Sequence, residues 1–394
     1  MKKKEKSPFA KELENARKIQ EDKQLPFEER QENRYKKVDY IFDELASKEN
    51  RYIFYCPDIP FGCSLVKIIY EYAKITQELG YKTIVLHEVK GFIPKWFDFD
   101  WAKDIKKDYV SSKEGGAAEY KFAPSDTIII PDGFFTIMKG FYQINPLHKV
   151  VLAIGYNGLA SMEPGYTWEA IGFKDVICIS EDIKNNYQSL FPNLNYYVSS
   201  YVVDFDKLTP LESKKIKPTI GLMIRDRELA SKIVNIFTNK YKYFNYFQFK
   251  VLKKLSISQY CDELSKCAVV IFADDKSAIP APLVEALATQ VPVITHKNSF
   301  LNSFQGVDTF YVTETMDEFE ITDCLANFCD LWSSNPSSVF KHSNIEIEKV
   351  LNNFKEENVK LSLIEILNNL QEEKIKTFTA IEKLIDEGKI DKNN

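Results

Sequence analysis

The sequence predicts an α/β protein with two doubly wound, Rossmann-like domains and additional helices at both ends. Short apolar runs rich in β-branched residues alternate with helical segments along most of the chain, which is typical of parallel sheets buried between helices. Two such series occur, and a lysine-rich stretch at 210–218 separates them as a linker would. Because parallel strands require crossover connections, each series is expected to form its own doubly wound sheet.

This alternation divides the chain into four regions. Residues 1–50 are a helical extension of mixed charge, and residues 51–209 are the first Rossmann-like domain. Residues 210–337 are the second such domain, and residues 338–394 are C-terminal helices. Charged helices at chain ends usually pack on a domain or on a partner, so oligomerisation through these ends is one expectation.

The first series contains six apolar runs that we interpret as strands. The helix expected between the first two runs begins near Ser64, a good N-cap residue, and ends at Gly80. A second helix is expected at 181–190. The expected strands are residues 52–55, 82–87, 127–130, 150–154, 175–180 and 196–198.

The second series repeats the pattern with five runs. Pro280 and Pro282 fit the first turn of a helix, where a missing N–H costs little. The expected strands are residues 219–224, 247–252, 268–273, 291–295 and 309–312. The expected helices are residues 229–239, 257–267, 283–288 and 316–332.

Composition limits the compartment and the partners. The net charge of −5 provides no overall attraction to nucleic acid or anionic membranes, although local basic faces remain open. Seven scattered cysteines without a close CxxC pair fit a reducing compartment. No apolar run approaches the roughly 20 residues that cross a bilayer. We expect a cytoplasmic protein, and the abundance of Lys, Ile, Asn, Phe and Tyr is typical of an AT-rich genome such as a virus, whose host cytoplasm would then apply.

Polar side chains follow several of the expected strands. In the first series Asp132, Asn157 and Ser180 with Glu181 come directly after strands, and His87 ends another. In the second series Arg225 and Arg227 follow the strand at 219–224. Carboxyl ends of parallel strands share one edge, where open α/β sheets bind ligands.

One segment, residues 268–298, carries a family resemblance. Its Glu285-Ala286-Leu287-Ala288 and Val291-Pro292-Val293-Ile294 runs closely resemble the nucleotide-binding segment of family 4 glycosyltransferases, which have the GT-B fold. The resemblance covers roughly residues 51–350. It implies an acceptor domain at 51–209, a nucleotide-sugar domain at 210–337, and a C-terminal helix at 338–351 that crosses back onto the first domain.

The resemblance also implies roles for several residues. Glu285 matches the second Glu of the family's Glu-x7-Glu pair, which holds the ribose of the donor. Ser277 stands where the first Glu is usual, and Asp274 or Asp275 lies close enough to substitute. Arg225 matches the family's diphosphate-binding Arg, whereas Arg227 and Lys232 both compete for the place of its Lys. The donor implied is a UDP- or GDP-linked sugar, with no further cofactor.

The chemistry expected at such a site is charge stabilisation. Negative charge grows on the departing diphosphate, so cationic donors aimed at it lower the barrier, and the planar fork of Arg225 suits two oxygens at once. Asp132 or His87 could orient or deprotonate the acceptor hydroxyl. The alternatives are structural: surface ion pairs for the arginines, a helix-face pair for Glu285, and a turn residue at Asp132.

A metal-dependent reading also has support in the sequence. Residues 98–100 and 204–206 both have the Asp-x-Asp form that binds a divalent ion in the other main transferase fold. The motif is short and common, and the second copy falls at the expected connection between domains. We expect no essential metal.

The sequence therefore predicts a metal-independent, retaining glycosyltransferase whose acceptor is a glycan or another small hydroxyl compound. The aromatic stretch at 91–125 could line an acceptor pocket or simply pin a loop to the domain. Two alternatives remain open. One is a viral enzyme that glycosylates hydroxylated DNA bases, and the other is an inert GT-B domain kept as a binding or assembly module.

Overall fold

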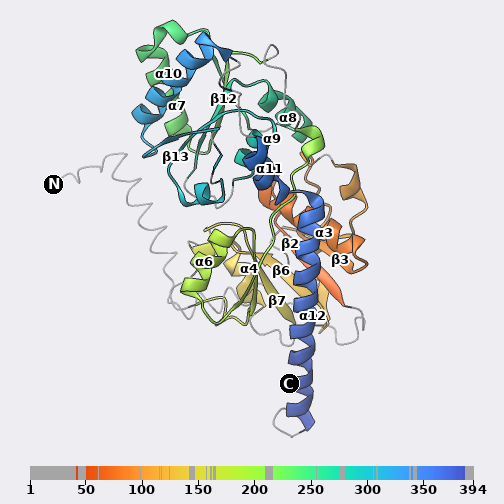
Figure 1. Ribbon diagram of the computed structural model, residues 1–394. Coiled ribbons are helices and arrows are strands. Elements are labelled where there is room, and N and C mark those ends of the chain that lie inside the picture. Colours follow the sequence, from red (N-terminus) through yellow and green to blue (C-terminus); the bar gives the residue numbers. More distant parts are fainter. Residues whose placement is uncertain are drawn as a thin grey trace, which may run out of the picture.

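The computed structural model describes the two α/β units and the C-terminal helices (Figure 1). The N-terminal helices expected within 1–50 lie largely outside the described residues, as do Asp275, Ser277 and most of the expected linker. The described residues are 41–42, 50–60, 62–97, 99–114, 116, 118–123, 125–141, 147–156, 158–159, 162, 166–208, 216–253, 255–274, 280–304, 306–307, 309–336, 339 and 344–386.

The first sheet has seven parallel strands in the order β4-β3-β2-β6-β7-β8-β9. All six expected strands of this half are present, and β4, which was not expected, adds an edge. The strands are β2 (Arg51–Cys56), β3 (Lys82–Val89), β4 (Lys107–Ser111), β6 (Thr127–Pro131), β7 (His148–Ala153), β8 (Asp175–Cys178) and β9 (Asn195–Val198). A separate two-residue pair joins β1 (Ile41–Phe42) to β5 (Lys121–Phe122).

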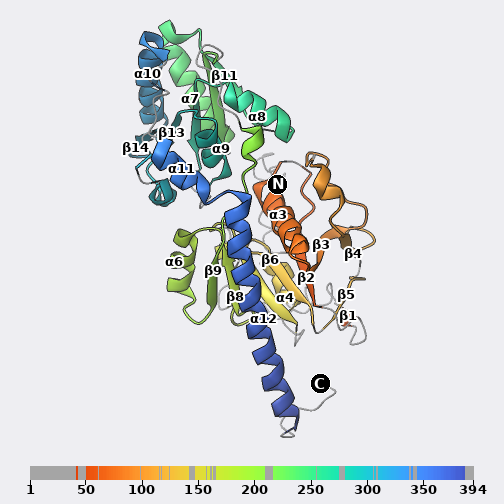
Figure 2. The same ribbon diagram turned by 45° about the vertical axis from the view of Figure 1, so that its right-hand side comes forward.

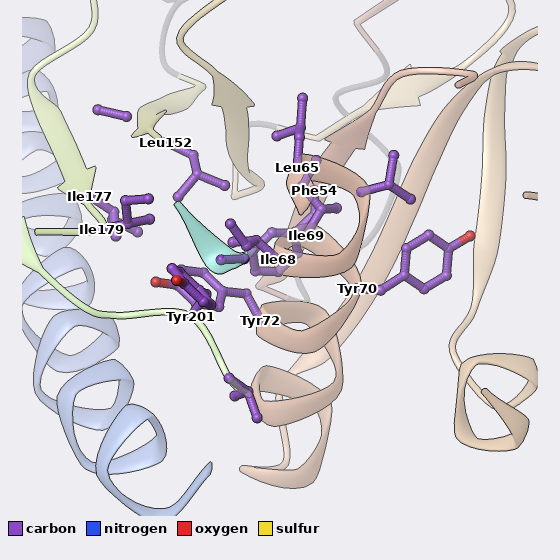
Figure 3. Packing of buried hydrophobic residues seen from close by; sticks show 14 of the residues in the cluster. Phe54, Leu65, Ile68, Ile69, Tyr70, Tyr72, Leu152, Ile177, Ile179 and Tyr201 are labelled. Atoms are coloured by element: carbon purple, nitrogen blue, oxygen red, sulfur yellow. The ribbon is translucent and has the colours of Figure 1, made fainter. Parts of the chain in front are cut away.

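Helix α3 (Ser64–Glu78) supplies much of the core of this unit. Its N-cap is Cys63, without a side-chain cap, so Ser64 is the first helical residue and not the cap that was expected. Its apolar face packs on the sheet, and Figure 3 shows Leu65, Ile68 and Tyr72 turned toward strand residues such as Phe54. The other helical segments of this unit are η1 (Asp100–Lys103), α4 (Phe135–Gly140), α6 (Glu181–Leu190) and η2 (Phe205–Lys207).

The second sheet has five parallel strands in the order β11-β10-β12-β13-β14. Gly221 in β10 is required by packing, because an added Cβ would lie 2.8 Å from Val270 Cγ1 and 2.9 Å from Leu252 Cδ1. The strands are β10 (Thr219–Ile224), β11 (Gln248–Val251), β12 (Val269–Ala273), β13 (Val293–His296) and β14 (Phe310–Thr313). All five were expected from the sequence, within a few residues at their ends.

The helices of the second unit begin at favourable caps. Asp226 accepts backbone N–H bonds at the start of α7, Ser256 forms a capping box at α8, and Pro282 occupies the first turn of α9. The helical segments are α7 (Arg227–Lys240), η4 (Lys242–Phe244), α8 (Ile257–Ser265), α9 (Ala281–Ala288), η5 (Ser299–Phe304) and α10 (Glu318–Ser334).

The chain passes between the units twice, before β10 and again between α11 and α12 (Figure 2). Helix α11 (Asn344–Asn352) packs against α9 of the second unit, and α12 (Glu356–Asp386) packs against α3 of the first. The return to the first unit is therefore made by α12, whereas the expected crossing helix at 338–351 corresponds mainly to α11. Val203 N–H donates to the Phe354 carbonyl at 3.0 Å, so the outgoing and returning chains lie side by side.

The expected fold class is confirmed: each unit is a doubly wound parallel sheet covered by helices. Among the helices that the structure describes, none combines the length and apolar character needed to cross a bilayer.

Candidate functional site

The candidate site lies at the carboxyl edge of the second sheet, where the strand order reverses. The chain runs from β10 outward to β11 and then back past β10 to β12, so the crossovers on either side of β10 and β12 run in opposite directions. Such a switch point opens a crevice that binds ligands in doubly wound sheets. Arg225 follows β10, and Asp274 follows β12.

Arg225 and Asp274 meet at this edge. Arg225 Nη2 lies 3.1 Å from Asp274 Oδ2, and the Arg225 side chain keeps 59% of its surface exposed while the Asp274 side chain keeps 7%. The Asp274 carboxylate therefore contacts one side of the Arg225 guanidinium group, and the rest of that group is exposed to solvent. An Arg placed in this way can bind an anion with its free edge.

A third strand end adds a lysine that the sequence interpretation missed. Lys253, just after β11, donates from Nζ to the Ile224 carbonyl at the end of β10. Its pKa is lowered first by burial and then by the positive charges of Arg225 and Arg227. Its place in the sequence, two residues after the strand that pairs with β10, could have indicated that Lys253 lies at the same sheet edge as Arg225. Three cationic groups thus gather at one edge, and a bound polyanion would relieve their repulsion.

Lys232 does not join this group. Its Nζ lies 3.0 Å from Glu228 on the same helix and 3.9 Å from Glu318 at the start of α10. Both of these carboxylate partners lie on helices, Glu228 on α7 and Glu318 on α10, and not at the sheet edge. Of the two candidates for the family's second cation, Arg227 lies near the site and Lys232 pairs away from it.

Glu285 occupies the junction between the two units. It lies on α9, and its Oε1 is 3.9 Å from Nζ of Lys67 on α3, with both side chains 14% exposed. Lys67 was not singled out from the sequence, because a lysine on a helix face carries no local signal for a partner more than two hundred residues away. The carboxylate implied to hold ribose is therefore beside a cation from the opposite unit.

Lys67 also faces a second carboxyl group. Glu71, one turn further along α3, has Oε1 at 3.7 Å from Lys67 Nζ and is almost fully buried. Burial raises the pKa of Glu71 to about 8, although Lys67 acts in the opposite direction. For Lys67, burial lowers the pKa, but the two carboxyl groups outweigh it and the net change is upward. At neutral pH Glu71 is therefore largely protonated, and the Lys67 ammonium group lies beside the Glu285 carboxylate.

Asp132 lies at the carboxyl end of β6 but is only 2% exposed. Burial raises its pKa to about 7, against hydrogen bonds from the backbone of Gly155, Gly133 and Ile154. Gly158 packs so closely that a Cβ there would meet Asp132 at 2.9 Å. This environment matches the structural alternative, a residue that fixes neighbouring loops, better than contact with an acceptor.

His87 is also a buried structural residue. Its Nε2 is 2.8 Å from the Tyr70 hydroxyl, and its Nδ1 is 3.0 Å from Asp58 Oδ1. Asp58 in turn accepts the backbone N–H groups of Glu88 and Val89. His87 therefore positions the loop after β2, and the expectation that it reaches the acceptor is not supported by its 2% exposure.

The aromatic stretch after β3 packs largely on its own unit. Trp96 Nε1 donates to the Ile59 carbonyl at 3.0 Å, and the Phe97 ring centroid lies 5.0 Å from that of Tyr70. This supports the interpretation of a loop pinned by its aromatics. Phe99 and Trp101 form the outer part of the cluster.

The Asp-x-Asp motifs do not converge with other metal-ligating side chains. Asp204 pairs with Lys207 at 3.5 Å, and Asp98 lies outside the described residues. Within the part of the chain that is described, no group of three or more His, Cys, Asp or Glu side chains is placed to hold a metal ion.

With two doubly wound units, a switch point in the second sheet and a C-terminal helix returning to the first unit, the chain has the GT-B fold of glycosyltransferases. It is similar to sucrose-phosphate synthase from Thermosynechococcus elongatus (TM-score 0.58, 10% identity) and to a glycosyltransferase from Rickettsia africae (TM-score 0.57, 13% identity). It is also similar to an alpha-glucosyltransferase solved with UDP and a DNA containing an HMU base (TM-score 0.51, 12% identity). Each likeness covers 82% of this chain and 99% of the other. No protein-family profile matches the sequence, and no curated protein does.

The shared ammonium of Lys67 leads to a pH prediction. In the folded protein Glu71 holds its proton up to about pH 8, whereas an unfolded chain releases it near 4.5. The folded state thus binds more protons between these values, and stability falls as pH rises through that window. Glu71→Gln removes this loss. We expect its stability relative to the wild type to improve as pH rises from 5 to 8, by at most about 1.4 kcal/mol per unit.

Urea unfolding of both proteins at several pH values measures the difference. The matched control is Glu357→Gln on α12, which makes the same change at an exposed carboxyl group. Parallel pH profiles for Glu71→Gln and the wild type would contradict the assignment.

Proposed function

We propose that the protein is a glycosyltransferase that transfers a sugar from a UDP- or GDP-linked donor to a hydroxyl acceptor. The observation that carries the proposal is the convergence of Arg225, Lys253 and Arg227 at the carboxyl edge of β10 and β11. The similar alpha-glucosyltransferase was solved with UDP, which supports a uridine nucleotide as the first donor to test. The sequence resemblance favours retention of the anomeric configuration, readable by NMR from the first product formed.

The cationic edge would act on the leaving group. Cleavage of the bond between the sugar and the diphosphate leaves additional negative charge on the diphosphate oxygens. Arg225 is held by Asp274, so its exposed N–H groups are positioned before the substrate binds and need little reorganisation. Lys253 is anchored through the Ile224 carbonyl close to the same point. These groups bind the developing charge more strongly than the ground state, which is the condition for a faster reaction.

Glu285 is proposed to accept the ribose hydroxyls. In the described arrangement Lys67 lies beside its carboxylate at 3.9 Å, a loose distance for an ion pair. A ribose that hydrogen-bonds to Glu285 would join or replace this contact. Asp132 and His87, both buried, are proposed to hold the loops at the carboxyl edge of the first sheet.

Nucleotide binding should depend on Arg225 and Lys253 at the sheet edge but not on Lys232 on helix α7. Arg225→Ala and Lys253→Ala each remove a charged hydrogen bond to the diphosphate, so we expect UDP binding to weaken by about 1.5–3 kcal/mol. Lys232→Ala is the matched control, because its amine pairs with Glu228 and Glu318, and it should bind UDP like the wild type. Calorimetric titration with UDP and GDP gives the comparison. Wild-type protein that binds neither at millimolar concentration would favour the inert binding module.

Turnover should survive chelation of metals. In the proposed reaction the charge on the leaving diphosphate is met by Arg225 and Lys253. We therefore expect the same rate of donor consumption with and without EDTA. Activity lost in EDTA, restored by manganese and absent in Asp204→Asn would instead support the metal-dependent alternative.

The acceptor is proposed to be a glycan or another small hydroxyl compound. A DNA acceptor would need unpaired basic groups near the cleft. Lys103 pairs with Asp100 at 2.7 Å, and Lys107 donates to the carbonyls of Ala102 and Ile105, so neither is available to a phosphate without losing these contacts. DNA modification stays as the second candidate because the similar alpha-glucosyltransferase was solved with DNA.

A gel-shift assay at low salt tests the choice of acceptor. We expect no salt-sensitive binding to duplex DNA at micromolar protein. Binding that falls steeply with added salt and weakens in the double variant Lys106→Gln, Lys107→Gln would reverse the order of the two acceptors.

A further inference from the structure

The carboxyl edges of the two sheets face each other. Helix α3 begins after β2, and α9 begins after β12, so both helices start at the carboxyl edge of their sheet. The beginnings of these helices meet, because Nζ of Lys67 on α3 lies 3.9 Å from Oε1 of Glu285 on α9. Helix α6, which follows β8 at the same edge of the first sheet, contacts η5, which follows β13. An acceptor that takes a sugar from the cationic edge is therefore held by the carboxyl edge of the first sheet.

The first sheet has its own switch point, between β2 and β6. The chain runs from β2 outward to β3 and β4, and then returns past β2 to β6. Ligands of doubly wound sheets bind outside the strand ends at such a point. Asp132 and His87, the acceptor residues expected from the sequence, are each only 2% exposed. Contact with an acceptor therefore requires another side chain at this edge.

Glu88, near the end of β3, lies on the side of the first sheet that faces away from α3. Figure 3 shows Phe54 close to residues of α3, and its neighbour Tyr55 points to the other side, because successive side chains of a strand alternate. Tyr55 pairs in register with Leu86, so Glu88, two residues further along β3, shares the side of Tyr55. The Tyr55 hydroxyl donates to Glu88 Oε1 at 2.5 Å, and the Tyr55 ring centroid lies 5.7 Å from that of Phe134, in the loop after β6. These three side chains thus extend across the ends of β3, β2 and β6.

The Glu88 carboxylate is held through one oxygen only. Its Oε1 accepts the Tyr55 hydroxyl, and the Glu88 backbone N–H donates to Asp58 Oδ1 at 3.2 Å, which fixes the base of the side chain. Oε2 has no hydrogen-bond partner among the described residues, and the residue is partly exposed. A carboxylate oxygen is an acceptor only, so Oε2 suits a hydroxyl group of a ligand.

The charge of Glu88 is not neutralised by a neighbour. No ion pair joins it to a lysine or arginine in the part of the chain that the structure describes. Lys90, two residues further along the chain, has its Nζ 5.2 Å from the centre of the Tyr109 ring. Asp58 adds a second carboxylate, although it accepts the N–H groups of Glu88 and Val89. A phosphate group at this edge would be repelled, whereas a neutral hydroxyl compound would not.

We propose that Glu88 binds the acceptor of the transfer reaction and selects acceptors that lack phosphate groups. Oε2 accepts a hydrogen bond from an acceptor hydroxyl group, while Tyr55 holds the carboxylate in place. This contact orients the acceptor and leaves the stabilisation of the departing diphosphate to Arg225 and Lys253. The inference rests on the proposed function, because only a donor bound at the cationic edge places the acceptor opposite it.

Saturation-transfer NMR on the full chain with saturating UDP tests this role. The probes are glucose, glycerol and myo-inositol, each compared with glucose 6-phosphate, glycerol 3-phosphate or myo-inositol 1-phosphate, respectively. We expect saturable binding of at least one neutral probe at millimolar concentration, and its phosphorylated partner should bind at least about tenfold more weakly.

Variants of Glu88 separate its charge from its structural contacts. Glu88→Ala should weaken the neutral probe about tenfold, because it removes the acceptor oxygen. Glu88→Gln keeps an acceptor for the Tyr55 hydroxyl but removes the charge. Its binding of the neutral probe should stay within about threefold of the wild type, while the gap to the phosphorylated probe narrows about fivefold. A purely structural role would change both probes equally.

Glu181→Gln is the matched control, because it makes the same change at the same sheet edge. The Glu181 side chain is 67% exposed and pairs with Lys184 at 3.2 Å, and the variant should keep the selectivity of the wild type.

Calorimetric titration with UDP distinguishes failure of this inference from failure of the proposed function. UDP should bind Glu88→Ala and Glu88→Gln as it binds the wild type. Wild-type protein that does not bind UDP would contradict the proposed function, and the acceptor assignment with it. Normal UDP binding would still overturn the role of Glu88 in three cases: no neutral probe binds saturably, the phosphorylated probes bind as well as the neutral ones, or Glu88→Gln keeps the selectivity of the wild type.

Discussion

The ammonium group of Lys67 lies where the two units meet, and the charges of the junction depend on it. It lies between Glu71 on its own helix and Glu285 on a helix of the second unit, and all three groups are largely removed from solvent. One positive charge cannot fully compensate two buried carboxylates, so one of them must keep its proton. The junction is thus sensitive to anything that changes the partners of either carboxyl group. One of them, Glu285, belongs to the proposed nucleotide site.

The cationic edge and the junction have complementary roles in this arrangement. At the edge, Asp274 and the end of β10 fix Arg225 and Lys253 before any substrate is present. Preorganised charge of this kind is effective because no binding energy is spent on arranging it. The junction is less strictly fixed, since the closest distances there are 3.7 and 3.9 Å. Under the proposed function, the fixed charge at the edge would face the leaving diphosphate, and the looser contact at the junction would face the ribose.

Several residues that looked chemically suggestive in the sequence serve the scaffold. His87 joins Tyr70 to Asp58, and Asp132 holds the loops after β6 and β7. Asp132 follows β6 as expected, whereas His87 lies inside β3, which continues to Val89 and does not end at His87 as the sequence predicted. The sequence did not show whether their side chains point to solvent or into the packed layer, because loops that approach from elsewhere in the chain decide this.

The sequence by itself determined the two parallel sheets, most of the order of strands and helices, and the location of Arg225 just after a strand of the second sheet. These features follow from local rules: the apolar period of a segment and the requirement that parallel strands share an edge. The place of Lys253 beside Arg225 and the pairing of Lys67 with Glu285 were decided only by the tertiary structure. Each joins residues from separate elements, and such contacts depend on crossover geometry and helix packing, which leave no local pattern in the chain. The same reason explains why α12, and not the segment at 338–351, makes the return to the first unit.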